Sequence, residues 1–435
     1  MNKNLTSMKS KIIPIISLFI SFVFLAISCE DSTYRAYTGN APVYLSYDDL
    51  RKSVINQEYE DLKNPGKIYF KDNYIFIVEE LKGIHIYDNS DPGSPSKTNF
   101  LKLPGVVDIS ISGQTLYADS YVDLVVLDLV DIRNIKEVVR LKDMLPYTIP
   151  PVDNDYPMAY VDEEKGVVID WEVRTIKERV NRNPNPYPIF WASSSAFMDK
   201  VNASGASSGI SGSGVGAGGS MARFGIKENV LYVMDQNSLK VFDITNNTTP
   251  VKINDIYPGW GIETMFLTED LMFLGTTTGM VILDISVSTS PFTIGSFSHA
   301  RSCDPVVVDD TLAYITLRTG TGCGGNLNVL DVVNISDITK PKAVISYGMT
   351  NPHGLGKDGD LLFICDGSAG LKVYDASDPL KITSNLIFNY PGINAYDVIP
   401  IADVLVLIGD DGLYQYDYTD VKNITLLSTI LVFKN

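Results

Sequence analysis

Histidine, the side chain that most often acts as a general base, is rare in this sequence. The 435 residues include three histidines, His85, His299 and His353, and no H-E-x-x-H, Cys-x-x-Cys or EF-hand motif. His85 alternates with apolar residues in the run GIHIYD, which is typical of a packed or edge strand position. A nucleophile–His–acid triad would therefore need His299 or His353. We expect no enzymatic activity, no metal and no cofactor.

Three glycine-containing strings match catalytic or nucleotide-binding patterns but lie in the wrong context. GASSG at 205–209 matches a nucleophile elbow, yet it lies in a Gly/Ser tract with no strand before it and no helix after it. Two strings match G-x-G-x-x-G, starting at Gly214 and Gly320. Neither opens a helix after a strand, so neither can direct a helix N-terminus at a phosphate.

The elements that must position any site recur along the chain. An alternating apolar run that ends in an acidic residue, such as LVVLD or LKVFD, occurs seven times. Its last residues are Asp88, Asp128, Asp243, Asp284, Asp331, Asp375 and Asp417, separated by 40, 115, 41, 47, 44 and 42 residues. Another β-branched or aromatic run precedes each one, and weaker strands flank the pair. The repeats predict an all-β fold, a single seven-bladed β-propeller with four strands in each blade.

The repeated aspartate has a structural explanation. It comes at a strand end before turn residues, where its carboxylate can accept backbone N–H groups. Seven equivalent turns explain seven copies better than seven active sites do. Each repeat owns its four strands, so we expect the ring to close without a borrowed strand, although residues 43–45 could add a strand at the seam.

A ring of polar residues is the best candidate for a binding site. Aligning the repeats on their second strands gives one position per blade at the start of the innermost strand, where the central channel of a propeller opens. The positions are Lys67, Asp108, Arg223, Glu263 (or Thr264), Asp304, His353 and Asp397 (or Tyr396). They could bind a partner loop, a glycan or another small polar ligand, or they could simply face the water of the channel. An alignment error of one residue would change this list.

The N-terminus has the pattern of a targeting signal. A segment with three lysines precedes an apolar stretch, 12–27, that is short for a membrane span. The string Leu-Ala-Ile-Ser-Cys that ends at Cys29 resembles a bacterial lipobox, which implies a lipoprotein signal peptide at 1–28 and a lipidated Cys29. An ordinary secretory signal or an N-terminal helix with an incidental cysteine is the alternative. Residues 29–41 are polar without a period, which is typical of a tether.

Two acidic residues, Glu30 and Asp31, follow the cysteine. Acid at this position resembles the surface-export signal of Bacteroidetes-type lipoproteins. The resemblance implies an outer membrane lipoprotein, exposed at the cell surface and held to the membrane only by its lipid.

The charge of the chain argues against one class of partner. The formal net charge is −17, and removal of three lysines with the signal peptide would make it −20. Such a surface repels phosphate backbones, so we expect no binding to nucleic acid.

An insertion at 145–220 breaks the period between the second and third repeats. It contains a predicted hairpin (AYVDEEKGVVIDWEV), which would contact a partner or cover a blade, and a flexible Gly/Ser tract. Cys303 and Cys323 lie in one repeat, and we expect them to form a disulfide in the oxidising envelope. Cys365 lies within an apolar strand and is expected to be buried.

The repeats resemble one known family. The strings LYADSYVDLVVLD and LLFICDGSAGLKVYDASDP are similar to LVIVD repeats, and the likeness extends over about 42–144 and 221–430. It implies a β-propeller domain over 42–435 in a bacterial envelope lipoprotein, in a family whose biochemical activity is largely unassigned.

We therefore expect a non-enzymatic cell-envelope lipoprotein whose propeller is a scaffold for interaction with another envelope protein. The alternative is binding of a glycan or small polar ligand at the channel mouth, with Trp260 as a stacking surface. A hydrolase or lyase with His353 as base and Arg223 stabilising an oxyanion is the third hypothesis.

Overall fold

The computed structural model describes residues 34–179, 217–218, 222–235, 237–299, 305–319 and 327–433. These residues form two compact units, each of which is described by itself. The smaller unit consists of residues 34–43, 152–162 and 170–179, and the larger unit contains the rest.

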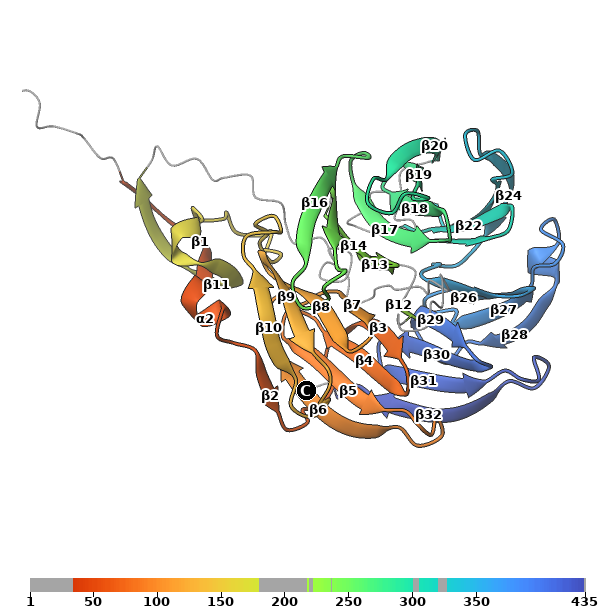
Figure 1. Ribbon diagram of the computed structural model, residues 1–435, viewed down its shortest axis with the longest axis horizontal. Coiled ribbons are helices and arrows are strands. Elements are labelled where there is room, and N and C mark those ends of the chain that lie inside the picture. The colour runs from red at the N-terminus through yellow and green to blue at the C-terminus, as the bar shows by residue number, and fades with distance from the viewer. Residues whose placement is uncertain are drawn as a thin grey trace, which may run out of the picture. The chain divides into compact units, whose positions relative to one another are not determined.

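The larger unit is a seven-bladed β-propeller with its sheets arranged around one axis (Figure 1). Every blade contains four consecutive antiparallel strands, and the first strands of successive blades contact one another around the axis. Blades 1 to 3 are β3 (Pro65–Lys71), β4 (Tyr74–Glu79), β5 (Gly83–Asp88) and β6 (Ser96–Lys102); β7 (Ile109–Ser112), β8 (Thr115–Ser120), β9 (Asp123–Asp128) and β10 (Lys136–Leu141); and β13 (Phe224–Lys227), β14 (Val230–Met234), β15 (Leu239–Asp243) and β16 (Val251–Ile256).

The other four blades repeat the same order. Blades 4 and 5 are β17 (Ile262–Leu267), β18 (Leu271–Thr276), β19 (Gly279–Asp284) and β20 (Phe292–Ser298); and β21 (Val306–Asp309), β22 (Leu312–Leu317), β23 (Val329–Asn334) and β24 (Lys342–Gly348). Blades 6 and 7 are β25 (Leu355–Asp358), β26 (Leu361–Cys365), β27 (Leu371–Asp375) and β28 (Leu386–Tyr390); and β29 (Ala395–Ile401), β30 (Val404–Gly409), β31 (Gly412–Asp417) and β32 (Thr425–Leu431). The predicted fold class, blade number and strand number are confirmed.

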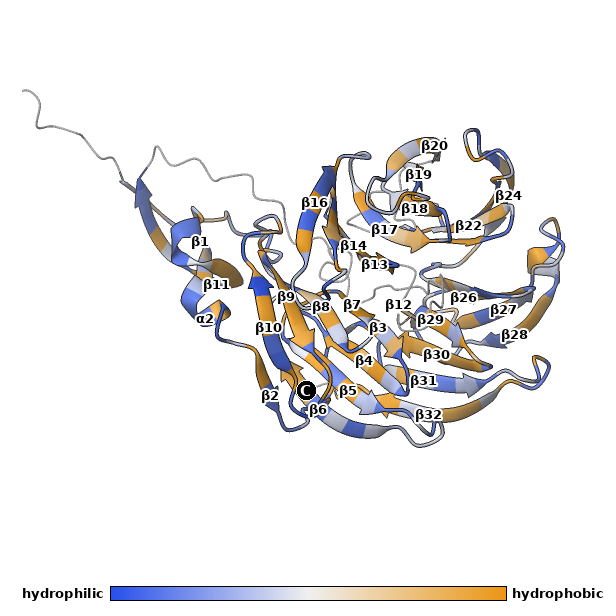
Figure 2. Cartoon of the chain, viewed as in Figure 1, coloured by the Kyte–Doolittle hydropathy of each residue, from blue (hydrophilic) through white to orange (hydrophobic). Residues whose placement is uncertain are grey.

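The core consists of apolar layers between adjacent blades. In β4, Ile75 and Ile77 pack against the last blade, whereas Phe76 and Val78 pack against the second blade. A middle strand is covered on both faces in this way, because successive side chains point to opposite faces of the sheet. Figure 2 accordingly shows mostly hydrophobic residues along β4 and β30, whereas the outer strand β10 contains three charged residues among its six.

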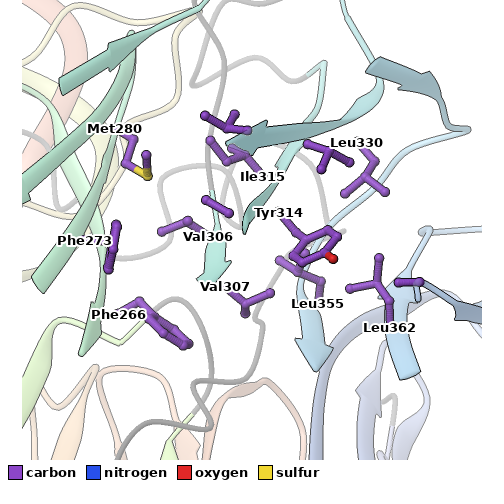
Figure 3. Close-up of a cluster of buried hydrophobic side chains, with 14 of the residues drawn as sticks. Phe266, Phe273, Met280, Val306, Val307, Tyr314, Ile315, Leu330, Leu355 and Leu362 are labelled. Atoms are coloured by element: carbon purple, nitrogen blue, oxygen red, sulfur yellow. The ribbon is translucent and has the colours of Figure 1, made fainter. Parts of the chain in front are cut away.

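One layer continues through three blades. Phe266 and Phe273 of blade 4, Val306 and Tyr314 of blade 5 and Leu362 of blade 6 belong to a single buried cluster (Figure 3). Such continuous burial stabilises the ring, because a four-stranded blade alone would leave both of its faces in water.

The ring closes without a borrowed strand, as predicted. Across the joint, the side-chain amides of Asn89 in blade 1 and Gln415 in blade 7 exchange hydrogen bonds of 2.9 and 2.7 Å. Blade 1 has two additional short strands instead: β2 (Ile55–Gln57) pairs with the outer strand β6, and β12 (Ala217–Gly218) pairs with the inner strand β3.

The turns after the third strands use the repeated aspartate as expected. The Asp88 carboxylate accepts hydrogen bonds from the backbone N–H of Ser90 at 2.9 Å and from its hydroxyl at 2.6 Å. The prediction is wrong in blade 5, where Asn334 accepts from the backbone N–H of Ser336 at 2.9 Å, and Asp331 lies within β23. The strand runs three residues beyond the acidic residue that the pattern selected.

Part of the insertion covers blades 1 and 2, one of the two roles predicted for it. Short helices α2 (Tyr47–Leu50) and η1 (Glu163–Lys165) lie in this part of the larger unit, and a third, η2 (Ile382–Ser384), lies in blade 6. Leu50, Val167 and Tyr147 pack with Tyr121 and Val122, which follow the second strand of blade 2.

The smaller unit contains most of a two-stranded sheet of β1 (Tyr34–Leu45) and β11 (Val167–Arg179), called here the ribbon. Arg35 donates two hydrogen bonds, of 3.1 and 2.6 Å, to Glu178 across this sheet. Two predictions are corrected: residues 34–41 belong to a strand rather than a tether, and β11 pairs with β1 rather than within the expected hairpin. A strand at 43–45 is present, but it does not join a blade.

Several predictions lie outside the described residues: the signal peptide, the lipid on Cys29, Asp304 and the Cys303–Cys323 disulfide. In the described part of the chain, no helix has the length and apolarity needed to cross a membrane.

Candidate functional site

The pairing of the strands fixes which residues are equivalent at the channel mouth. In every blade, the fourth residue of the second strand pairs with one residue of the first strand, and the residue just before this paired residue is the mouth position. In blade 1, for example, Ile77 pairs with Ile68, so the mouth position is Lys67. The resulting positions are Lys67, Asp108, Arg223, Thr264, Pro305, Gly354 and Asp397. Asp304 and His353 were each predicted one residue too early. Of the two residues predicted for blade 4, Thr264 is the equivalent one rather than Glu263, and the other four predicted residues are equivalent.

Local bulges explain two of the ambiguous positions. The pairing of β17 with β18 skips Glu263, and the pairing of β29 with β30 skips Tyr396. A bulge inserts one residue that has no partner opposite, so counting along the sequence cannot assign the register there.

The mouth residues of blades 1 to 3 are joined by one carboxylate. Oδ2 of Asp108 accepts a hydrogen bond from Nζ of Lys67 at 3.0 Å and bonds from the backbone N–H groups of Arg223 and Phe224, the latter at 3.3 Å. The guanidinium group of Arg223 donates to the carbonyl of Met234 at 3.1 Å. These three charged residues therefore connect blades, which is a structural role.

A second buried acid supports this linkage. Oδ1 of Asp119 accepts the backbone N–H groups of Val107 and Asp108 at 2.7 and 3.0 Å. Burial raises the pKa of Asp119 to about 6, while the positive charge of Arg223 and the backbone donors oppose that shift.

Asp397 in blade 7 repeats the conformation of Asp108 but not its partners. Oδ1 accepts the backbone N–H of the following residue in both, at 2.8 Å from Ile109 and 2.7 Å from Val398. Oδ2 of Asp397 has no hydrogen-bond partner among the described residues. The residue is fully buried, and burial raises its pKa to about 8, although Lys67 lowers it. Asp397 is therefore a buried carboxyl whose environment favours the protonated form at neutral pH.

His353 is buried beside this position. Its Nε2 lies 3.0 Å from Nδ2 of Asn351, its ring centroid lies 5.6 Å from that of Tyr396, and its Nδ1 has no partner among the described residues. Burial, with the charge of Arg318 adding to it, holds the pKa of His353 well below its ordinary value. The imidazole is thus neutral at physiological pH and is not exposed to a substrate in bulk water.

Sequence reasoning missed a second set of acids, at the ends of the second strands. Glu79, Asp119 and Asp366 each accept two consecutive backbone N–H groups of the segment that enters their own blade, at 2.7–3.1 Å. The signal was present in the strings YIFIVE, TLYADS and LLFICD, each of which contains one of these carboxylates. Asp366 also forms an ion pair with Lys372, in which Nζ lies 2.5 Å from Oδ2. This set holds the entrance segments of the blades in place.

An exposed aromatic pair lies on the loop between blades 3 and 4. Trp260 is 81% exposed and Tyr257 is 74% exposed. The loop ends at Gly261, whose carbonyl accepts the backbone N–H of Thr277 at 2.9 Å and whose φ of +65° favours glycine. An indole with this exposure is unusual and offers a stacking surface.

The acids described above are used in hydrogen bonds rather than gathered at one point. Over the described ranges, no group of three or more His, Cys, Asp and Glu side chains is placed to hold a metal ion.

Comparison with known proteins identifies the repeat. The model of the LVIVD repeat matches residues 218–255 and 268–298. These ranges include the strands of blade 3, apart from the last residue of β16, and the last three strands of blade 4. No curated protein matches the chain.

Solved structures match the chain only at low identity and with TM-scores below 0.5. The crystal structure of Saccharomyces cerevisiae Sqt1 is 8% identical with a TM-score of 0.47, and the match covers 91% of this chain and 89% of that chain. The computationally designed Ika8 protein is 10% identical with a TM-score of 0.47, over 86% and 90%. The structure of Kluyvelomyces marxianus Hsv2 is 10% identical with a TM-score of 0.45, over 85% and 100%. Similarities at this level say nothing about function.

Proposed function

We propose that this chain is a non-enzymatic lipoprotein of the bacterial cell envelope, of the Bacteroidetes type, whose propeller is a scaffold for protein–protein interaction at the cell surface. The lipobox-like string before Cys29, followed by Glu30 and Asp31, supports lipidation and export. The partner is another envelope protein, and the lipid is the attachment to the outer membrane.

The ribbon is the observation that carries this proposal. Its strands have 12 and 13 residues, and most of β11 is exposed, including Val173. An isolated two-stranded sheet is only marginally stable in water. A partner that covers exposed apolar residues such as Val173 and Tyr34 would remove them from water, which favours binding.

The test is affinity purification of the tagged full chain after crosslinking in membranes of a bacterium that encodes it. We expect one stoichiometric partner, lost in Val173→Glu and kept in Val251→Glu, which changes an exposed valine on the outer strand β16. The proposal fails if nothing co-purifies beyond what a lipid-anchored control propeller captures, or if both variants behave alike.

Lipidation has its own test. Cys29→Ser removes the acceptor thiol, so we expect the protein to lose incorporated fatty acid and to leave the membrane fraction. A variant that stays labelled and membrane-bound would refute lipidation at Cys29.

Burial of His353 supports the non-enzymatic assignment over the hydrolase or lyase hypothesis. A general base must reach the proton that it removes, within hydrogen-bond distance or through one water. The ring of His353 is fully buried and its pKa is well below its ordinary value.

Glycan or small polar ligand binding at the channel mouth is the second candidate, favoured by Trp260, which presents its indole to solvent. A glycan screen of the purified chain tests it. Trp260→Ala should weaken any binding, whereas Asp397→Asn, a change at a fully buried side chain, should leave it unchanged. Retention of full affinity in Trp260→Ala would exclude this site.

A further inference from the structure

A hollow of ≈ 500 Å³ lies beside the outer strand of blade 2. Arg51, Lys52 and Val54 form one side, and residues 137–140 of β10 form the other. Among the described strands, β10 pairs only with β9, so its outer edge presents backbone N–H and C=O groups that no strand satisfies.

Two guanidinium groups in the wall are held rigidly. Arg51 donates to both oxygens of Asp123, at 3.0 and 3.1 Å, and its guanidinium lies 5.1 Å from the ring centroid of Tyr47. Arg140 donates to both oxygens of Glu137, at 3.1 and 2.8 Å. The walls are therefore organised before any ligand arrives, which lowers the entropic cost of binding.

Lys52 and Val138 supply an exposed positive charge and an exposed apolar side chain to the hollow. Lys52 is exposed, and its ammonium group has no partner among the described residues. Val138 is the residue that the pairing of β10 with β9 skips, and it is 44% exposed. Arg51 and Arg140 are neutralised by ion pairs with three carboxylates, those of Asp123, Asp143 and Glu137. Lys52 is therefore the one lining cation without an ion pair among the described residues, and it favours a carboxylate at its own position.

The chain itself shows how such an edge is covered. In blade 1, β2 adds to the outer strand β6, with Asn56 opposite Leu101. The side-chain amide of Asn56 also donates to the carbonyl of Ile135 at 2.6 Å and accepts its N–H at 3.0 Å. The hydrogen bonds of Asn56 thus reach Ile135, the residue before β10, and the lining of the hollow begins two residues later at Glu137.

We propose that an extended, acidic segment of a partner protein adds as a strand to the outer edge of β10, with a carboxylate beside Lys52 and an apolar side chain against Val54 and Val138. Main-chain hydrogen bonds supply affinity in this mode of recognition, and side-chain pockets supply specificity. The inference rests on the proposed interaction function and names one docking surface and the chemistry of its ligand.

The experiment uses a display library of random 12-residue peptides selected on the purified full chain. The enriched peptides are expected to alternate acidic and apolar residues. Synthetic copies should bind about tenfold more weakly to Lys52→Glu, because a like charge replaces an attractive one. Lys340→Glu, a matched exposed lysine in another blade, should leave binding unchanged. Hydrogen exchange should slow at residues 136–141 when a peptide is bound.

Three results would overturn the inference: no enrichment above selection without protein, equal binding to the wild type and Lys52→Glu, or protection of amides away from β10. The outcome is separable from the test of the proposed function. A membrane partner that depends on Val173 but not on Lys52 would leave the interaction function in place and eliminate the strand-addition site.

Discussion

Asn89 and Gln415 lie 326 positions apart in the sequence and face each other at the joint of the ring, where their side-chain amides exchange two hydrogen bonds. Gln415 is fully buried and also donates to the carbonyl of Pro92 at 3.2 Å. A propeller can also close when the first and last blades share the strands of one sheet. Here the terminal blades are complete, so the joint depends on this amide pair and on an apolar layer that includes Ile77 and Leu413.

Removal of either amide should therefore loosen the joint. We expect Gln415→Ala to lower the free energy of unfolding by about 1–3 kcal/mol, because the amide of Asn89 loses a buried partner. Asn89→Ala should have a similar effect, and a double-mutant cycle in urea should give a coupling of about 1 kcal/mol or more. Pairing Asn89→Ala with the distant Thr339→Ala should be additive. Additivity in both cycles would mean that the amide pair does not hold the joint.

The carboxylate of Asp108 should matter for a different reason. In Asp108→Ala, the ammonium of Lys67 and the backbone N–H groups of Arg223 and Phe224 lose their common acceptor. Breaking a buried ion pair from one side costs about 3–5 kcal/mol. Urea unfolding measures the loss, with Glu58→Ala as an exposed control. If Asp108→Ala is as stable as the control, the linkage of the three blades has no energetic role.

The period of the sequence was sufficient to predict the blades, because strand alternation and turn chemistry are local. Asp88 and Ser90, for example, are two residues apart, and their hydrogen bond needs nothing beyond the turn that contains them. The register at the channel mouth was not predictable in the same way. A bulge at Glu263 left two candidates in blade 4. In blades 5 and 6 the first two strands pair without a bulge, so the one-residue errors at Asp304 and His353 came from the alignment of the repeats.

Contacts between blades were the least predictable. Lys67, Asp108 and Arg223 were correctly placed at the mouth, but nothing in the sequence indicates that one carboxylate joins all three. The pairing of β1 with β11 likewise brings together segments more than 100 residues apart, so a local pattern favoured a hairpin instead. Such pairs depend on the closed ring or on tertiary packing, which no local pattern specifies.

The role of the turn aspartates can be tested by substitution, and Asn334 in blade 5 shows which replacement the turn tolerates. Asp88→Ala removes the acceptor for the N–H and hydroxyl of Ser90, so we expect a lower melting temperature. Asp88→Asn should be closer to wild type, because Asn334 fills the same role in blade 5. Equal melting temperatures for the Asn and Ala variants would show that the side-chain acceptor is dispensable.

These turns should also respond to acid. The hydroxyl of Ser90, followed by its N–H, lowers the pKa of Asp88, and the equivalent bonds of Ser377 lower that of Asp375. A carboxyl with a lowered folded-state pKa stabilises the fold above its unfolded pKa and loses that contribution as pH falls through the folded value. The stability gap between wild type and Asp88→Asn should therefore change only at acidic pH, as urea titrations from pH 7 to pH 3 would measure.

Asp397 should have the opposite pH dependence. Burial raises its pKa from 3.8 to about 8, so the folded state binds more protons than the unfolded state between these values. The free energy of unfolding must then fall as pH rises through this window, because stability decreases with pH wherever the folded state holds the extra proton. In Asp397→Asn the side chain cannot ionise, so this pH dependence of the free energy of unfolding should disappear. The free energy of unfolding of the variant should therefore rise relative to that of the wild type between pH 5 and pH 9. Urea unfolding of both proteins across that range measures the difference. Parallel pH profiles would show that the Asp397 carboxyl is ionised in the fold, with a partner for Oδ2 that keeps it so.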